Sequence, residues 1–142
     1  MARKRIAARS AGAKSDQTLY LCQYSYTAAA WDNLLKPDAQ RDRIKAVKDL
    51  VYALGGCFPE ITIPCSSGPN PSEKFGSFGE HDVVLLVAFP SDTAMAAFAM
   101  AISAGGAVSS FKTTKLLSWD QMMEAMALAA DKRTSYRTLP KK

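Results

Sequence analysis

The sequence FGEHDVVLLVAFP, from Phe78 to Pro90, joins a glycine turn and three polar residues to a continuous apolar run. The seven apolar residues are rich in β-branched side chains and are followed by a proline, which is typical of a central strand buried on both faces. Asp82 and His81, the single histidine of the chain, come directly before this run. They are therefore expected where a buried strand begins.

The length and the charge distribution indicate how many domains the chain has and where they lie. The 142 residues suffice for one domain with a hydrophobic core. Residues 1–16 and 131–142 each carry five Lys or Arg and one Asp, whereas residues 17–130 carry eight basic and eleven acidic side chains. We therefore expect a basic disordered arm at 1–17, a folded domain at 18–130 and a basic tail at 131–142. Whether the arm is a transit peptide stays open. Because the body of the chain is not basic, a nucleic-acid groove in the domain is not expected.

The cysteines and the apolar segments indicate the setting of the protein. Cys22, Cys57 and Cys65 are odd in number and lack CxxC spacing, which predicts free thiols and neither a disulfide framework nor a zinc knuckle. A reducing, cytoplasmic location is the expectation. No apolar stretch approaches the ~20 residues of a membrane helix, so no integral membrane segment is expected.

Side-chain periodicity predicts four strands, at 19–26, 57–65, 83–89 and 108–117. A helix is expected from Thr27 to Leu54 with a bend or restart at Pro37, a second from Ser91 to Gly105, and a third from Ser118 to Ala130 with a capping box at Gln121. Charged residues, Arg43 among them, are expected on the solvent side of the first helix, and the methionines of the third helix are expected to pack. The turn-rich stretch at 66–77 is either a mobile loop or a lid.

The order of these elements, βαββαβ plus a C-terminal helix, predicts an α+β, ferredoxin-like antiparallel sheet with two helices on one face. The strand from Val83 to Phe89 is apolar at every position and cannot leave its second face in water. One terminal helix covers only part of that face. We therefore expect two identical subunits to pair sheet to sheet as a dimeric α/β barrel.

Several motifs resemble those of the GYD domain family. They are a strand at Tyr20–Thr27 followed by a helix, LGG at 54–56, GEHDVV at 79–84, PSD at 90–92 and SAGGAV at 103–108. The resemblance covers about Leu19 to Leu117. It implies a dimeric α/β barrel in which ligands commonly enter between the sheet and the helices or between the sheets. His81 stands where the family usually has a tyrosine.

The candidate site residues each have a second interpretation. His81 and Asp82 are candidates for catalytic acid/base groups, and their other interpretation is a structural role through hydrogen bonds to the Gly79 turn and the dimer partner. Glu80 is a candidate ligand contact or a solvated residue. Tyr24 and Tyr26 are candidates for a pocket that holds a flat organic ligand, or for core and interface positions. Lys112 lies either at a cavity rim or at a solvated strand end.

The sequence supports no metal or cofactor, because one histidine lacks spaced ligands and no phosphate-binding glycine loop is present. The leading hypothesis is a homodimer that binds a small aromatic or polyketide-like molecule. Cofactor-independent chemistry of the isomerase, cyclase or oxygenase type is a further hypothesis, so whether the protein is an enzyme stays open. The alternative is a non-enzymatic assembly or adaptor module whose basic termini bind an acidic partner, a membrane surface or nucleic acid.

Overall fold

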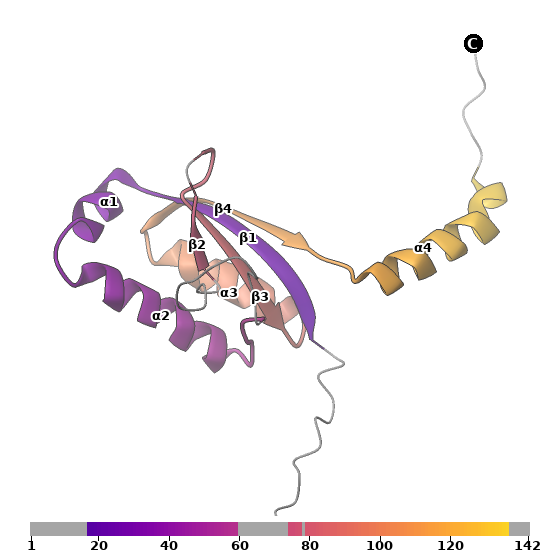
Figure 1. Ribbon diagram of the computed structural model, residues 1–142, viewed down its shortest axis with the longest axis horizontal. Coiled ribbons are helices and arrows are strands. Elements are labelled where there is room, and N and C mark those ends of the chain that lie inside the picture. The colour runs from indigo at the N-terminus through magenta and orange to yellow at the C-terminus, as the bar shows by residue number, and fades with distance from the viewer. Residues whose placement is uncertain (1–16, 60–73, 78, 137–142) are drawn as a thin grey trace, which may run out of the picture.

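The strands of the chain form one antiparallel sheet in the computed structural model, which describes residues 17–59, 74–77 and 79–136 (Figure 1). The elements are β1 (Thr18–Tyr26), α1 (Ala28–Leu34), α2 (Ala39–Ala53), β2 (Lys74–Gly76), β3 (Val83–Phe89), α3 (Asp92–Ala104), β4 (Val108–Lys115), α4 (Trp119–Lys132) and a 3₁₀ turn at Arg133–Ser135. The sheet order is β2-β3-β1-β4, with every neighbouring pair antiparallel. The predicted α+β class is confirmed.

The edge strand before β3 differs from the prediction. Lys74–Gly76 pairs with Val83–Leu85, although the sequence interpretation assigned these three residues to a loop. That assignment is wrong. Three residues, one of them a glycine, are too few to show an alternating pattern. Cys57 forms an isolated bridge to Ala88. Residues 60–65 of the predicted strand, and most of the predicted loop or lid, lie outside the described residues.

One face of the sheet forms the core with α2 and α3. Alternate residues of β1 and β3 point to these helices and are joined there by apolar residues at helical spacing, among them Val47 and Val51 of α2 and Met95, Phe98 and Ile102 of α3. The helix starts follow the predicted caps. The side chains of Thr27 and Ser91 accept hydrogen bonds from Ala30 N and Ala94 N, and Ser118 forms a capping box with Gln121.

The other face of the sheet is open. Val84, Leu86 and Ala88 of β3 are only half-buried, as are Leu19 and Leu21 of β1. Within the single chain, β3 is therefore buried on one face. That a second subunit covers the other face, as its apolar residues predict, stays a prediction.

Helix α4 extends away from the sheet and contains no buried residue (Figure 1). Its apolar side chains are exposed, with Trp119 at 73%, Met123 at 51% and Leu128 at 59% of full exposure. The sequence interpretation expected the helix to cover part of the sheet and its methionines to be packed, which is wrong within one chain. No helix in the described ranges has the length and apolar character needed to cross a membrane.

Candidate functional site

A cavity of about 280 Å³ lies between α1, α2 and the sheet. Aromatic side chains line it at Tyr26, Trp31 and Phe58. Its aliphatic wall is formed from both sides, by α1 and α2 and by β3, at Leu34, Leu35, Ile44, Val47, Val83 and Leu85. The wall is therefore predominantly apolar, and its polar groups are few, which is the composition of many small-molecule sites.

The geometry of the turn between α1 and α2 positions the two helices that border the cavity. Pro37 separates the two helices, and Asp38 adopts a left-handed conformation with φ of 68° immediately before α2. Trp31 of α1 packs edge-to-face on Tyr26, with ring centroids 5.4 Å apart, but remains 41% exposed. The short helix thus presents an aromatic side chain at the cavity without burying it.

Arg43 is the charged residue that sequence reasoning missed. It precedes the buried residues Val47 and Val51 at intervals of four, so it belongs to the row of α2 that faces the sheet. The sequence interpretation placed Arg43 on the solvent side, which is wrong because it is half-buried and borders the cavity. Its guanidinium carbon lies 5.8 Å from the centroid of the Tyr26 ring.

Two guanidinium nitrogens of Arg43, Nε and Nη2, are shielded from solvent and have no hydrogen-bond partner within the described part of the chain. Lys48 also borders the cavity. The cavity-lining residues in the described ranges include no Asp or Glu. The charged residues that line the cavity in the described ranges, Arg43 and Lys48, are therefore both basic.

Of the four predicted ligand contacts, only Tyr24 and Tyr26 are recorded in contact with each other, edge to face with ring centroids 5.6 Å apart. Tyr26 lines the cavity, and Tyr24 lies behind it, 1% exposed and stacked on Phe111 at 5.6 Å between ring centroids. Burial raises the pKa of Tyr24. Glu80 is an exposed hairpin residue whose carbonyl accepts a hydrogen bond from Ser25 Oγ at 3.4 Å. Lys112 is exposed beside Gln23 on the open face of the sheet, opposite the cavity.

Asp82 fastens the β2–β3 hairpin to β1. Its carboxylate Oδ2 accepts a hydrogen bond from Tyr26 N at 2.8 Å, its own N–H donates to the Tyr24 carbonyl at 3.0 Å, and its carbonyl accepts from Ser77 N at 2.8 Å. His81 is half-buried, and its Nδ1 has no hydrogen-bond partner among the described residues. These contacts fit the structural interpretation of Asp82, while the catalytic roles of His81 and Asp82 stay a prediction.

The turn between β2 and β3, which ends at Asp82, is also the most specific part of the sequence resemblance. Residues 67–126 match the GYD domain. The match spans the hairpin, β3, α3, β4 and the first half of α4, whereas β1, α1 and α2 lie outside it. The cavity is therefore formed jointly by the GYD domain and by the segment that precedes it. No curated protein matches the chain.

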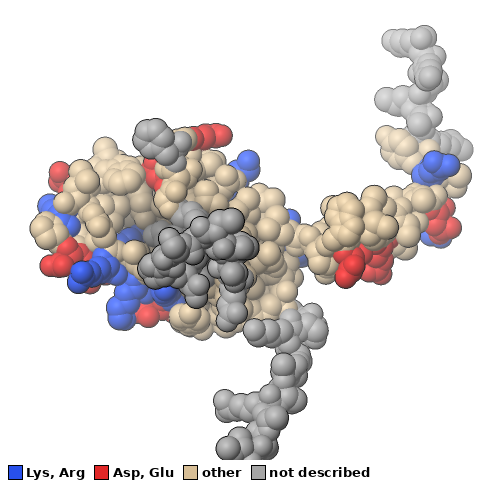
Figure 2. Space-filling model, viewed as in Figure 1, with Lys and Arg blue, Asp and Glu red and all other residues tan. Residues whose placement is uncertain are grey.

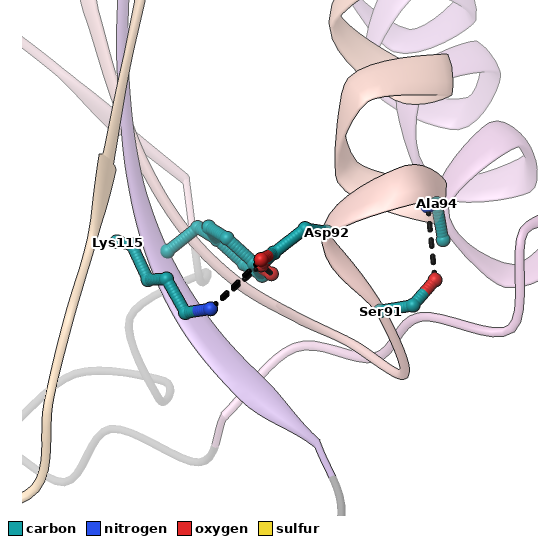
Figure 3. Close-up of polar contacts among 5 residues, drawn as sticks. Ser91, Asp92, Ala94 and Lys115 are labelled. Atoms are coloured by element: carbon teal, nitrogen blue, oxygen red, sulfur yellow. Dashed lines mark hydrogen bonds and ion pairs between the residues drawn. The ribbon is translucent and has the colours of Figure 1, made fainter.

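A second polar cluster ties the GYD domain to β1. Tyr20 donates its O–H to Asp92 Oδ1, and Lys115 Nζ lies 2.9 Å from both carboxylate oxygens of Asp92 (Figure 3). Burial, followed by the contact with Asp92, raises the pKa of Tyr20 to about 12. The hydrogen bond from Tyr20, followed by that from Lys115, lowers the pKa of Asp92. Sequence spacing gave no signal for this cluster, because Tyr20 and Asp92 are 72 residues apart.

The described thiols and acids of the chain do not form a metal centre. Within the described ranges, no three His, Cys, Asp or Glu side chains gather as a possible metal site. Cys22 and Cys57 are free thiols, as predicted, whereas Cys65 lies outside these ranges. Burial raises the pKa of Cys22 to about 12, so the thiol is protonated and poorly nucleophilic at neutral pH.

Proposed function

We propose that this GYD domain protein binds a small, largely apolar organic molecule in the cavity between α1, α2 and the sheet. The observation that carries the proposal is the cavity itself, with aromatic side chains at Tyr26, Trp31 and Phe58 around a volume of about 280 Å³. Ligand sites are commonly concave, mostly apolar and supplied with a few polar groups. The volume is close to the lower end of the range of about 300–1,000 Å³ for such sites.

The two sides of the cavity differ in a way that suits reversible binding. Its floor belongs to the core, because Val47 is 2% exposed and Leu85 is fully buried. Its outer wall leaves apolar side chains in water, with Trp31 at 41%, Ile44 at 43% and Leu35 at 76% exposure. A ligand that covers these side chains gains favourable burial while the floor stays in place.

The open sheet face supports a homodimer of the α/β-barrel type. Leu21 lies opposite Leu86 across the β1–β3 pair, and Leu19 lies opposite Ala88, so apolar side chains adjoin on the uncovered face. A second copy presents the same surface and buries both in a self-complementary contact. The apolar side of α4, which is separate from the body in Figures 1 and 2, supplies further surface for the second copy.

Acid/base chemistry at His81 and Asp82 stays a separate prediction, because neither is among the described residues that line the cavity. It would be tested by turnover of an identified ligand by His81→Ala, and full turnover by that variant would rule it out. The adaptor alternative depends on the basic termini at 1–16 and 131–142, of which only 131–136 are among the described residues. It too stays a prediction.

The binding proposal is tested with N-phenyl-1-naphthylamine, a neutral dye whose emission rises in apolar surroundings. The full-length protein is expected to bind one dye per chain in a saturable titration. Ile44→Trp fills the cavity and should weaken binding about tenfold or more, because a steric clash replaces the dye's contacts. Met100→Trp adds the same side chain at a position that is 71% exposed on α3, away from the cavity, and should bind normally. Equal binding by wild type and Ile44→Trp would contradict the proposal.

A further inference from the structure

Arg43 carries more information about the ligand than the apolar wall does. A guanidinium group normally satisfies its N–H donors with water, backbone carbonyls or carboxylates. Arg43 nevertheless has Nε and Nη2 shielded from solvent and without a hydrogen-bond partner in the described residues. Shielding such donors costs free energy unless an acceptor is supplied. Arg43, which borders the cavity, therefore has two donors that stay unsatisfied within the described residues.

The identity of the two nitrogens matters. The N–H bonds of Nε and Nη2 point in parallel from one edge of the planar guanidinium, and that edge matches the two oxygens of a carboxylate in a bidentate pair. A neutral carbonyl or hydroxyl satisfies only one of the two donors well. An acceptor that satisfies both donors thus has the geometry of a carboxylate.

The surroundings favour an anion as well. Lys48 is the second cation at the cavity wall, and the described lining residues include no acid that would compete for Arg43. The Tyr26 ring, 5.8 Å from the guanidinium carbon, holds Arg43 from one side by a cation–π contact. In Figure 2, basic side chains gather over the α2 side of the molecule, although acidic ones lie among them.

We propose that the ligand of this cavity is an aromatic carboxylate. Its carboxylate pairs with Arg43 when the guanidinium turns its Nε–Nη2 edge into the cavity, and its ring packs among Tyr26, Trp31 and Phe58. The inference rests on the proposed function, since it assigns a chemical class to the ligand of the same cavity. Arg43 then determines specificity, because it separates an acid from a neutral molecule of equal shape. A charge-assisted, bidentate pair in a shielded site is among the stronger polar contacts in proteins.

The test compares 2-naphthoate, which is ionised at neutral pH, with the neutral and nearly isosteric 2-naphthamide by titration calorimetry. Wild type should bind 2-naphthoate about tenfold or more tightly than 2-naphthamide. Arg43→Met keeps an apolar stem but removes the charge, so it should bind both compounds with the affinity that wild type has for 2-naphthamide. Retained 2-naphthamide binding by this variant also shows that the cavity is folded.

The matched control is Arg41→Met, which removes an exposed cation of the same helix that does not line the cavity. It should keep the preference for 2-naphthoate, so that a loss caused by net charge alone is excluded. If wild type binds both compounds equally, or if Arg43→Met keeps the preference, the carboxylate inference is overturned while the binding proposal stands. If wild type binds neither compound nor the neutral dye, both are overturned.

Discussion

Arg43 continues the buried row of α2 that holds Val47 and Val51, one helical turn apart. The apolar members of this row were predictable from spacing alone. Arg43 was assigned to solvent because a cation counts as polar in such a pattern, although its aliphatic stem can lie along an apolar surface. His81 and Asp82 were located correctly at the start of β3, but the backbone contacts of Asp82 depend on the distant strand β1 and left no sequence signal.

Asp82 is expected to contribute to stability through its carboxylate. Asp82→Ala should lower the free energy of unfolding by about 1–2 kcal/mol, because the N–H of Tyr26 loses its acceptor. Asp82→Asn retains one side-chain oxygen and should lose less. Urea unfolding measures both, with Glu80→Ala as the control at an exposed acid of the same turn. Equal stability of the Ala variant and wild type would show that the hydrogen bond is not stabilising.

Tyr20 is expected to make stability depend on alkaline pH. Its folded-state pKa is raised from 10.0 to about 12, so its contribution is complete below pH 10 and is lost as the pH rises toward 12. Tyr20→Phe should cost about 1 kcal/mol at neutral pH and progressively less above pH 10. Urea unfolding of both proteins at neutral and alkaline pH measures the difference. A pH-independent difference would contradict the assignment.

Among the elements, β1, β3, β4 and α3 were the most predictable, because their side chains alternate or repeat over seven residues or more. The capping box of α4 was predictable from Ser118 and Gln121, since both partners are local. The short strand β2 and the detached position of α4 were not. Three residues carry no periodic signal, and an apolar stripe does not identify the surface that will cover it.

Gly56 is expected to control how closely the segment after α2 packs against β3. A Cβ atom at this position would lie 2.6 Å from a ring carbon of Phe89 and 2.8 Å from the Ala88 carbonyl oxygen, which is too close for either. Gly56→Ala should therefore lower the free energy of unfolding by about 1–3 kcal/mol.

The control for this prediction is Gly79→Ala, because a Cβ atom there meets nothing within 4 Å. It should be close to neutral in the same urea experiment. Equal stability of the two variants would show that the close approach at Gly56 is not a packing constraint.

At the scale of the whole molecule, one layer of helices covers one face of the sheet, and the second face is open (Figure 1). The apolar character of Val83–Phe89 predicts that a second subunit covers this face. The resemblance implied ligand sites between the sheet and the helices, and Tyr26 was a pocket candidate. The part that α1 and α2 play in the cavity wall was not predicted, because it depends on the turn between them at Pro37. Periodicity identifies which faces are apolar and does not measure the space left between them.

The homodimer is expected to depend on the open sheet face. Leu86→Asp places a charge opposite Leu21 and should shift the protein to a monomer in sedimentation equilibrium, because burying an unpaired carboxylate is costly. Far-UV circular dichroism should stay unchanged, since Leu86 is not part of the core cluster. Met100→Asp changes an exposed apolar residue of α3 and should leave the dimer intact. A Leu86→Asp variant that remains dimeric would contradict this interface.

The most direct measurement is a crystal structure of the protein with bound N-phenyl-1-naphthylamine. The ligand is expected to lie within one chain, between the helices and the sheet. The dye should therefore lie between α1, α2 and β3, with its rings against Tyr26 and Trp31. A dye bound instead on the open sheet face, between Leu21 and Leu86 and a second copy, would contradict it.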